Sequence, residues 1–192
     1  PRKRAKIIKP TNRKNFLSFD LSIQPISIRF CINIKTNPMD KKKKRSRYNR
    51  IYTQISELMP KSDDKLARMA TIIAVLHHKM EYFFWTGYYF LKDDKLIVGP
   101  YQGPVACQEL EKNTGVCWAG VNRQEPVVVP DVEQFPGHIA CDSRSKSEIV
   151  LPIRNDRNEI IGVLDIDSSE PNAFDEADQE ELARILRLVY EV

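Results

Sequence analysis

Three cysteines, Cys107, Cys117 and Cys141, lie in or beside the part of the chain whose hydrophobic pattern is least regular. Cys141 follows "PGHIA" and precedes "DSRSKS", where no apolar pattern predicts burial. No secretory signal is recognisable, so we expect a reducing compartment, where thiols are more often catalytic, metal-binding or simply buried than paired in structural disulfides. We therefore expect the three sulfur atoms to meet above a sheet and to carry redox chemistry.

Zinc binding is the competing interpretation of the same stretch. Cys107, Cys117, His138 and Cys141 together offer four ligands of the types that zinc prefers. The spacing contains no Cys-x-x-Cys pair, however, and His-x-x-Cys alone is a weak signal. Redox chemistry is therefore favoured, with a structural zinc domain as an alternative.

Three carboxylates are expected on one face of a strand pair. Along "IIGVLDIDS", Leu164 and Ile166 point to one face while Asp165 and Asp167 point to the other, and Glu148 opens the neighbouring strand "EIVLPI" on the same side. Clustered carboxylates repel, so at least one should have a raised pKa, keep its proton near neutral pH and act as an acid, while an ionised neighbour binds an ammonium group. A solvated acidic rim without a role explains the spacing about as well.

Two aromatic residues point to a methyl-binding site. Trp85 and Tyr89 are four apart in a strand-like segment, so they share one face unless Gly87 introduces a bulge. Core packing is the default interpretation, and an apolar box for a methyl or thioether group is the functional one.

The elements that must position these residues follow from hydrophobic periodicity. Helices are expected over residues 48–59, 63–80 and, shorter, 105–113; strands over 82–91, 96–101, 126–132, 148–153 and 159–167; and a last helix from 174 onward with Asp175 as its N-cap. This order predicts an α+β fold: an antiparallel sheet with helices packed on one face and the active-site loops on the other. Ile51 and Ile55 on the first helix suit either the core or a symmetric dimer interface.

Composition disfavours several functional classes. No apolar run approaches the roughly 20 residues of a membrane span, and the chain has neither a GxGxxG motif nor a phosphate-binding loop. Residues 1–50 hold 16 of the 30 Lys and Arg but 2 of the 26 Asp and Glu, which leaves 14 basic and 24 acidic residues in 51–192. The folded part is therefore acidic, and we expect it to bind neither nucleic acid nor a membrane.

The charge asymmetry divides the chain into a basic, irregular N-terminal extension, residues 1–47, and one domain, residues 48–192. Residues 1–38 are expected to be an upstream segment, with Met39 as a natural start. A strand hairpin over "LSIQPISIRFCINI" is the alternative, and the lysine run 41–44 is expected to be a solvated, frayed end.

The segments "GPYQGPVACQ", "GVCW", "VPDVEQFPGHIACDSRSKSEIVLPI" and "GVLDIDS" together closely resemble the free methionine-R-sulfoxide reductases, a family built on the GAF fold. The resemblance runs from about residue 48 to the C-terminus, and "PGHIACD" followed by "SEIVLPI" is its most specific part. One departure is Trp118, since the family usually has glycine after the second cysteine.

The resemblance implies a GAF-like catalytic domain that reduces the R epimer of free methionine sulfoxide. Cys141 would attack the sulfoxide and become a sulfenic acid, and Cys107 would resolve it to a disulfide, with Cys117 as a second candidate resolver. Thioredoxin or another external dithiol would then reset the enzyme, with no bound cofactor or metal.

The resemblance also assigns the substrate pocket: Trp85 and Tyr89 around the methyl group, and Glu148, Asp165 and Asp167 around the polar end. It implies a cytoplasmic enzyme and allows a homodimer. The alternative from another class is a GAF sensor that binds a small ligand without turnover. A sensor is normally joined to an output domain, so we expect the enzyme.

Overall fold

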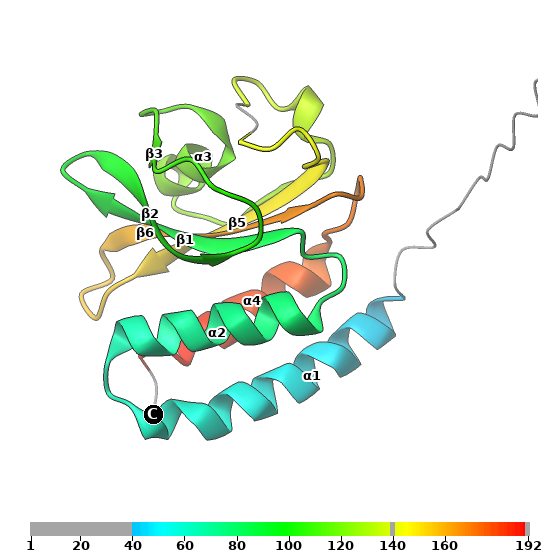
Figure 1. Ribbon diagram of the computed structural model, residues 1–192, viewed down its shortest axis with the longest axis vertical. Helices are drawn as coiled ribbons and strands as arrows, with labels where there is room; N and C mark the ends of the chain where they lie inside the picture. The colour runs from blue at the N-terminus through cyan, green and yellow to red at the C-terminus, as the bar shows by residue number, and fades with distance from the viewer. Residues whose placement is uncertain (1–39, 139–140, 191–192) are drawn as a thin grey trace, which may run out of the picture. The chain divides into compact units, whose positions relative to one another are not determined.

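The computed structural model describes residues 40–138 and 141–190, arranged around a single antiparallel sheet (Figure 1). The order of its six strands is β3-β2-β1-β6-β5-β4. Their bounds are β1 Trp85–Lys92, β2 Lys95–Gln102, β3 Glu109–Leu110, β4 Val127–Val129, β5 Ser147–Arg154 and β6 Ile160–Ser168. The predicted α+β class and both predicted hairpins are confirmed. The hairpin suggested for "LSIQPISIRFCINI" lies outside the described residues.

Helices lie on both faces of the sheet (Figure 1). On one face α2, Lys65–Lys79, and α4, Glu176–Arg187, pack against the strands, and α1, Lys41–Leu58, packs on these two helices. On the other face lie α3, Gly115–Arg123, and the loops. Two short 3-10 turns complete the chain, η1 Met59–Lys61 and η2 Val132–Gln134. The predicted separation of helices from loops therefore holds except for α3.

Strand alternation divides the buried side chains into two cores, one on each face. Leu164 and Ile166 of β6 belong to the core on the side of α2 and α4, whereas Val163 belongs to the core on the side of α3. Tyr88 of β1 likewise faces the helices, while its neighbour Tyr89 faces α3. The strand residues expected to carry chemistry therefore lie on the predicted face of the sheet.

The secondary structure predicted from sequence periodicity was wrong in the irregular middle of the chain. Residues 105–113 were expected to be helical, but Glu109 and Leu110 form β3, which pairs with β2. The helix is α3 instead, with Cys117 in its first turn. Its sequence "GVCWAGVNR" has two glycines and two valines, which have low helix propensity, and it is stabilised by packing. Gly120 permits this packing, because a side chain there would press on Val150 of β5.

The lysine run was also misjudged, because residues 41–47 form the first turns of α1 rather than a frayed end. Lys44 is 3% exposed, and its Nζ lies 2.5 Å from Asp178 and 2.8 Å from the carbonyl oxygen of Ala173. Asp178 also accepts hydrogen bonds from the hydroxyls of Tyr48 and Tyr82. It closes a capping box at the start of α4 with Asp175, the predicted N-cap.

The first helix is therefore part of the domain core. Ile51 and Ile55 are 2% and 0% exposed and pack in the helix-side core, so they are not free to form a dimer interface. Among the described residues, no helix combines the length and the apolar character that a membrane crossing requires.

Replacing Asp178 with alanine should destabilise the fold strongly, since Lys44 would lose its closest carboxylate and two tyrosine hydroxyls their acceptor. We expect a loss of about 3 kcal/mol or more in the free energy of unfolding, measured by urea denaturation. Asp156→Ala is the matched control, because its pair with Lys65 is exposed and should contribute at most about 1 kcal/mol. Equal losses in the two variants would contradict this account of α1.

Candidate active site

One pocket of about 220 Å³ lies between the sheet, the start of α3 and the loops that carry Cys107 and Cys141. All eight residues singled out in the sequence line it: Trp85, Tyr89, Cys107, Cys117, Cys141, Glu148, Asp165 and Asp167. The structure thus brings together segments up to 82 positions apart in the numbering, from Trp85 to Asp167. Their placement in one cavity is observed, while the role of each remains a prediction.

Strand register lines up the floor of the pocket. Asp167 of β6 lies directly between Trp85 of β1 and Glu148 of β5. Two positions along, Asp165 lies between Gly87 and Val150. Directly opposed side chains in antiparallel strands have their Cβ atoms about 5 Å apart, so this register forces the acids into contact range and sets the indole beside them.

The aromatic wall depends on Gly87. Trp85 stacks on Tyr89 with ring centroids 5.7 Å apart and on Tyr101 with centroids 5.4 Å apart. A Cβ at Gly87 would overlap the Trp85 ring. The bulge that we considered at Gly87 is a register shift against β2, whereas the pairing of β1 with β6 is continuous, so Trp85 and Tyr89 keep one face.

Two of the three cysteines in the pocket form a disulfide. Cys107 and Cys141 are bonded, with their Cα atoms 5.9 Å apart and a sequence separation of 34. Cys141 is exposed and Cys107 half-buried. The third, Cys117, is a buried free thiol. The exposed bond at the rim can be reached by an external thiol, while Cys117 is shielded inside the pocket.

The three acids of the pocket lie in an environment that destabilises the ionised form of a carboxyl group. Glu148 and Asp165 are 5% and 6% exposed, and no Lys or Arg is among the described residues that line the pocket. Burial, followed by the charge of neighbouring acids, raises the pKa of Glu148 and of Asp165 well above their usual range. Asp167 is only half-buried and accepts a hydrogen bond from Ser145, and burial raises its pKa to about 6.

These directions separate the acids by protonation state. The upward shifts of Glu148 and Asp165 favour their protonated forms, whereas a pKa of about 6 leaves Asp167 largely ionised at pH 7. Glu148 and Asp165 are therefore the better candidates for proton donors, and Asp167 is the better candidate for the anion.

Cys117 is unsuited to be the primary nucleophile. Burial, with the added charges of Asp165 and Glu148, raises the pKa of its thiol well above the usual range. A thiol that stays protonated at neutral pH is a poor nucleophile. This makes a donor role, or a role after the first step, more consistent with its position.

His138 is a pocket residue that we considered only as a zinc ligand. Its Nδ1 lies 3.8 Å from Oε2 of Glu148. Burial lowers the pKa of His138 and raises that of Glu148, so both shifts favour the neutral forms and disfavour an ion pair between them. The buried Nε2 has no hydrogen-bond partner in the part of the chain that the structure describes.

The loop after Cys141 contributes residues that sequence reasoning missed. Asp142 and Ser145 both line the pocket. Arg144 binds Asp142 through its side chain at 2.7 Å and lies over the ring of Phe84 at 4.7 Å. Hydrogen bonds from Arg144 lower the pKa of Asp142 to about 2. The sequence "CDSRS" contained a signal for this compact loop, because Asp and Ser side chains often hydrogen-bond to nearby backbone groups and so stabilise turns.

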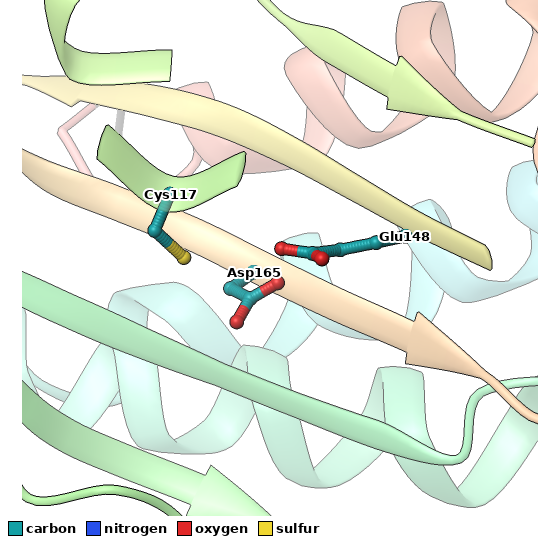
Figure 2. Close-up of side chains that lie close together, drawn as sticks. All are labelled: Cys117, Glu148 and Asp165. Carbon is teal, nitrogen blue, oxygen red and sulfur yellow. The ribbon is translucent and has the colours of Figure 1, made fainter. Parts of the chain in front are cut away.

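The zinc set considered as an alternative to redox chemistry does not assemble in this structure. The sulfur atoms of Cys107 and Cys141 are bonded to each other and so cannot serve with Cys117 and His138 as four ligands. A different group, Cys117, Glu148 and Asp165, has its potential ligand atoms within 4.8 Å of one another (Figure 2).

Comparison with known proteins gives one consistent result. The GAF domain family model matches residues 70–189. GAF domain-containing protein A of Dictyostelium discoideum is 43% identical over 152 residues, 79% of this chain and 95% of that protein. Free methionine-R-sulfoxide reductase of Escherichia coli is 40% identical over 139 residues, 72% of this chain and 84% of that protein. Among solved structures, that of free methionine-R-sulfoxide reductase from Neisseria meningitidis in complex with its substrate matches with a TM-score of 0.72 and 37% identity, and covers 76% of this chain and 87% of that chain.

Asp167 should make the stability of the fold depend on pH. Its pKa is about 6 in the folded protein against an ordinary 3.8, so the folded state holds the proton more tightly and loses stability as pH rises from about 4 to about 6. Asp167→Asn should remove this loss and raise the free energy of unfolding at pH 7 by roughly 1 to 2 kcal/mol.

Chemical denaturation of both proteins at a series of pH values measures this difference. Asp156→Asn, on the exposed turn between β5 and β6, is the control and should leave the pH profile unchanged. Parallel profiles for wild type and Asp167→Asn would show that Asp167 titrates normally.

Proposed function

The chain belongs to the GAF-domain family of free methionine-R-sulfoxide reductases, and on this basis we propose that it reduces free L-methionine-(R)-S-oxide to methionine. The observation that carries the proposal is the disulfide between Cys107 and Cys141 at the rim of the acid-lined pocket. A thiol pair that can close beside proton donors is what a thiol-dependent reduction needs.

The pocket is complementary to a free amino acid. The stacked rings of Trp85 and Tyr89 offer an apolar wall for the methyl group of the sulfoxide. Ionised Asp167 offers a partner for the α-ammonium group, with no competing Lys or Arg among the described lining residues. A methionine sulfoxide within a protein has no free ammonium, so the pocket favours the free form.

The chemistry proceeds by thiol attack. In the reduced enzyme the thiolate of Cys141 attacks the sulfoxide sulfur while a protonated carboxyl group, Glu148 or Asp165, delivers a proton to the oxygen. In the adduct the methionine sulfur carries both the sulfur of Cys141 and the new hydroxyl group. The hydroxyl then transfers to the sulfur of Cys141 as the S–S and S–O bonds to the methionine sulfur break, so that methionine leaves and Cys141 becomes a sulfenic acid. The thiol of Cys107 then displaces this oxygen as water and forms the disulfide, which accounts for both electrons that the sulfoxide gains.

The cycle needs an external dithiol, and we assign this role to thioredoxin or a protein of similar chemistry. Cys141 is exposed, and Val105, two residues before Cys107, is 86% exposed. A partner thiolate can therefore reach the disulfide and contact an apolar side chain next to it. A reducing compartment such as the cytoplasm suits this exchange. No bound cofactor enters the proposed steps.

Turnover should depend unequally on the cysteines. With dithiothreitol as reductant, Cys141→Ser should lose at least about 100-fold in the rate of methionine formation, because the nucleophile is missing. Cys107→Ser should accumulate a sulfenic acid that dimedone labels. Cys31→Ser, outside the described residues, is the control and should match wild type. Ligand binding without turnover by the wild-type protein would favour a sensor, and retained turnover in Cys141→Ser would refute the assigned nucleophile.

Acetylating the amino group of the substrate should reduce kcat/KM by about 100-fold or more, since Asp167 would be left without its charged partner, a loss of about 3 kcal/mol. Initial rates with free and N-acetylated methionine-(R)-S-oxide measure this effect. The Asp167→Asn variant is the internal control, because it should discriminate much less between the two substrates. Equal discrimination by both enzymes would place ammonium recognition elsewhere.

A further inference from the structure

Three side chains from three different elements converge on the floor of the pocket. Cys117 comes from α3, Glu148 from β5 and Asp165 from β6, and Figure 2 shows their end groups gathered around one point. One potential ligand atom from each lies within 4.8 Å of the other two, and all three residues are buried. A thiol and two carboxylates in this arrangement form a mixed sulfur and oxygen donor set.

Asp165 provides a second, independent observation. It is 6% exposed, and its buried Oδ1 has no hydrogen-bond partner within residues 40–138 and 141–190. A buried carboxylate oxygen without a partner is costly. Since no described Lys or Arg lines the pocket, a cation from solution is the partner that the geometry lacks.

We propose that Cys117, Glu148 and Asp165 form a binding site for a divalent cation of the zinc class. Zinc takes four ligands at about 2.0 to 2.3 Å from thiolates, imidazoles and carboxylates, which places neighbouring ligand atoms about 3.3 to 3.7 Å apart. Side-chain rotations that move the donor atoms by about 1 Å would bring the three donors to these separations. The thiolate ligand disfavours magnesium and calcium, which prefer oxygen.

His138 is positioned to supply the fourth ligand. It lines the same pocket, its Nδ1 lies 3.8 Å from Glu148, and its Nε2 is buried without a partner among the described residues. A water molecule is the alternative. Binding requires Cys117, Glu148 and Asp165 all to be deprotonated, so the protons that these groups hold pass to the solvent as the metal is coordinated.

This site differs from the zinc set considered in the sequence. It uses neither Cys107 nor Cys141, so closure of their disulfide leaves all three ligands in place. It also occupies the region that the proposed function gives to the polar end of the substrate. If that function holds, metal and methionine sulfoxide compete for the pocket.

The oxidised protein provides a test that needs no turnover. In a Cys31→Ser background, with the disulfide between Cys107 and Cys141 formed, Cys117 is the one free thiol among the three remaining cysteines. Co²⁺ added to this protein should produce the near-ultraviolet absorption of a thiolate–cobalt bond, and Zn²⁺ should abolish it at one equivalent per chain. Absence of the band would overturn the proposal.

Two further variants guard against misfolding and non-specific binding. Cys117→Ser and Asp165→Asn are nearly isosteric substitutions. Each should weaken Zn²⁺ binding by more than roughly 100-fold, the upper effect of removing a residue that only hydrogen-bonds to a metal ligand. Their circular dichroism should match that of the parent protein. Unchanged affinity in either folded variant would exclude that residue as a ligand and overturn the site.

Competition separates this proposal from the proposed function. Free L-methionine-(R)-S-oxide should reduce the cobalt band in proportion to its binding. A band that forms but does not respond to the sulfoxide would leave the metal site intact and contradict the proposed location of the substrate. A protein that reduces the sulfoxide but shows no band would retain its function and lose the metal site.

Discussion

Strand register is the constraint on which the pocket depends. β6 is flanked by β1 and β5, and the pairing of Asp167 with both Trp85 and Glu148 holds the acids in one pocket, where no Lys or Arg is among the described lining residues. A slip of one residue would turn the acids toward the helices and Leu164 and Ile166 toward the pocket. The apolar residues therefore stabilise the register that holds the carboxylates in an unfavourable position, where their pKa values rise.

The two faces of the sheet consequently have different roles, one in stability and the other in forming the pocket. The helix face carries the larger apolar core and the buried cluster of Lys44, Asp178 and two tyrosines, in which each charge has a close partner. The other face carries acids without a described Lys or Arg partner in the pocket, a buried thiol and a disulfide at the rim. Stability on one face permits electrostatic strain on the other, a distribution typical of catalytic sites.

Much of this could be predicted from the sequence, because strands alternate strictly and the relevant residues lie on strands. The faces of Glu148, Asp165 and Asp167 followed from period two alone. Residues in loops and in α3 were harder: a glycine-rich helix has no strong local signal, and Lys44 looks solvated unless its spacing to Tyr48, Ile51 and Ile55 is noticed. Contacts that depend on tertiary packing, such as His138 beside Glu148, leave no periodic trace.

The central claim is that Cys107 and Cys141 store the two electrons that reduce one sulfoxide. The most direct measurement is a single turnover: fully reduced protein, freed of reductant, is mixed with one equivalent of L-methionine-(R)-S-oxide, and methionine and disulfide-linked peptides are quantified together. We expect one methionine per chain and a peptide pair joining Cys107 to Cys141. Methionine formed with both of these thiols still free, or no methionine at all, would contradict the account.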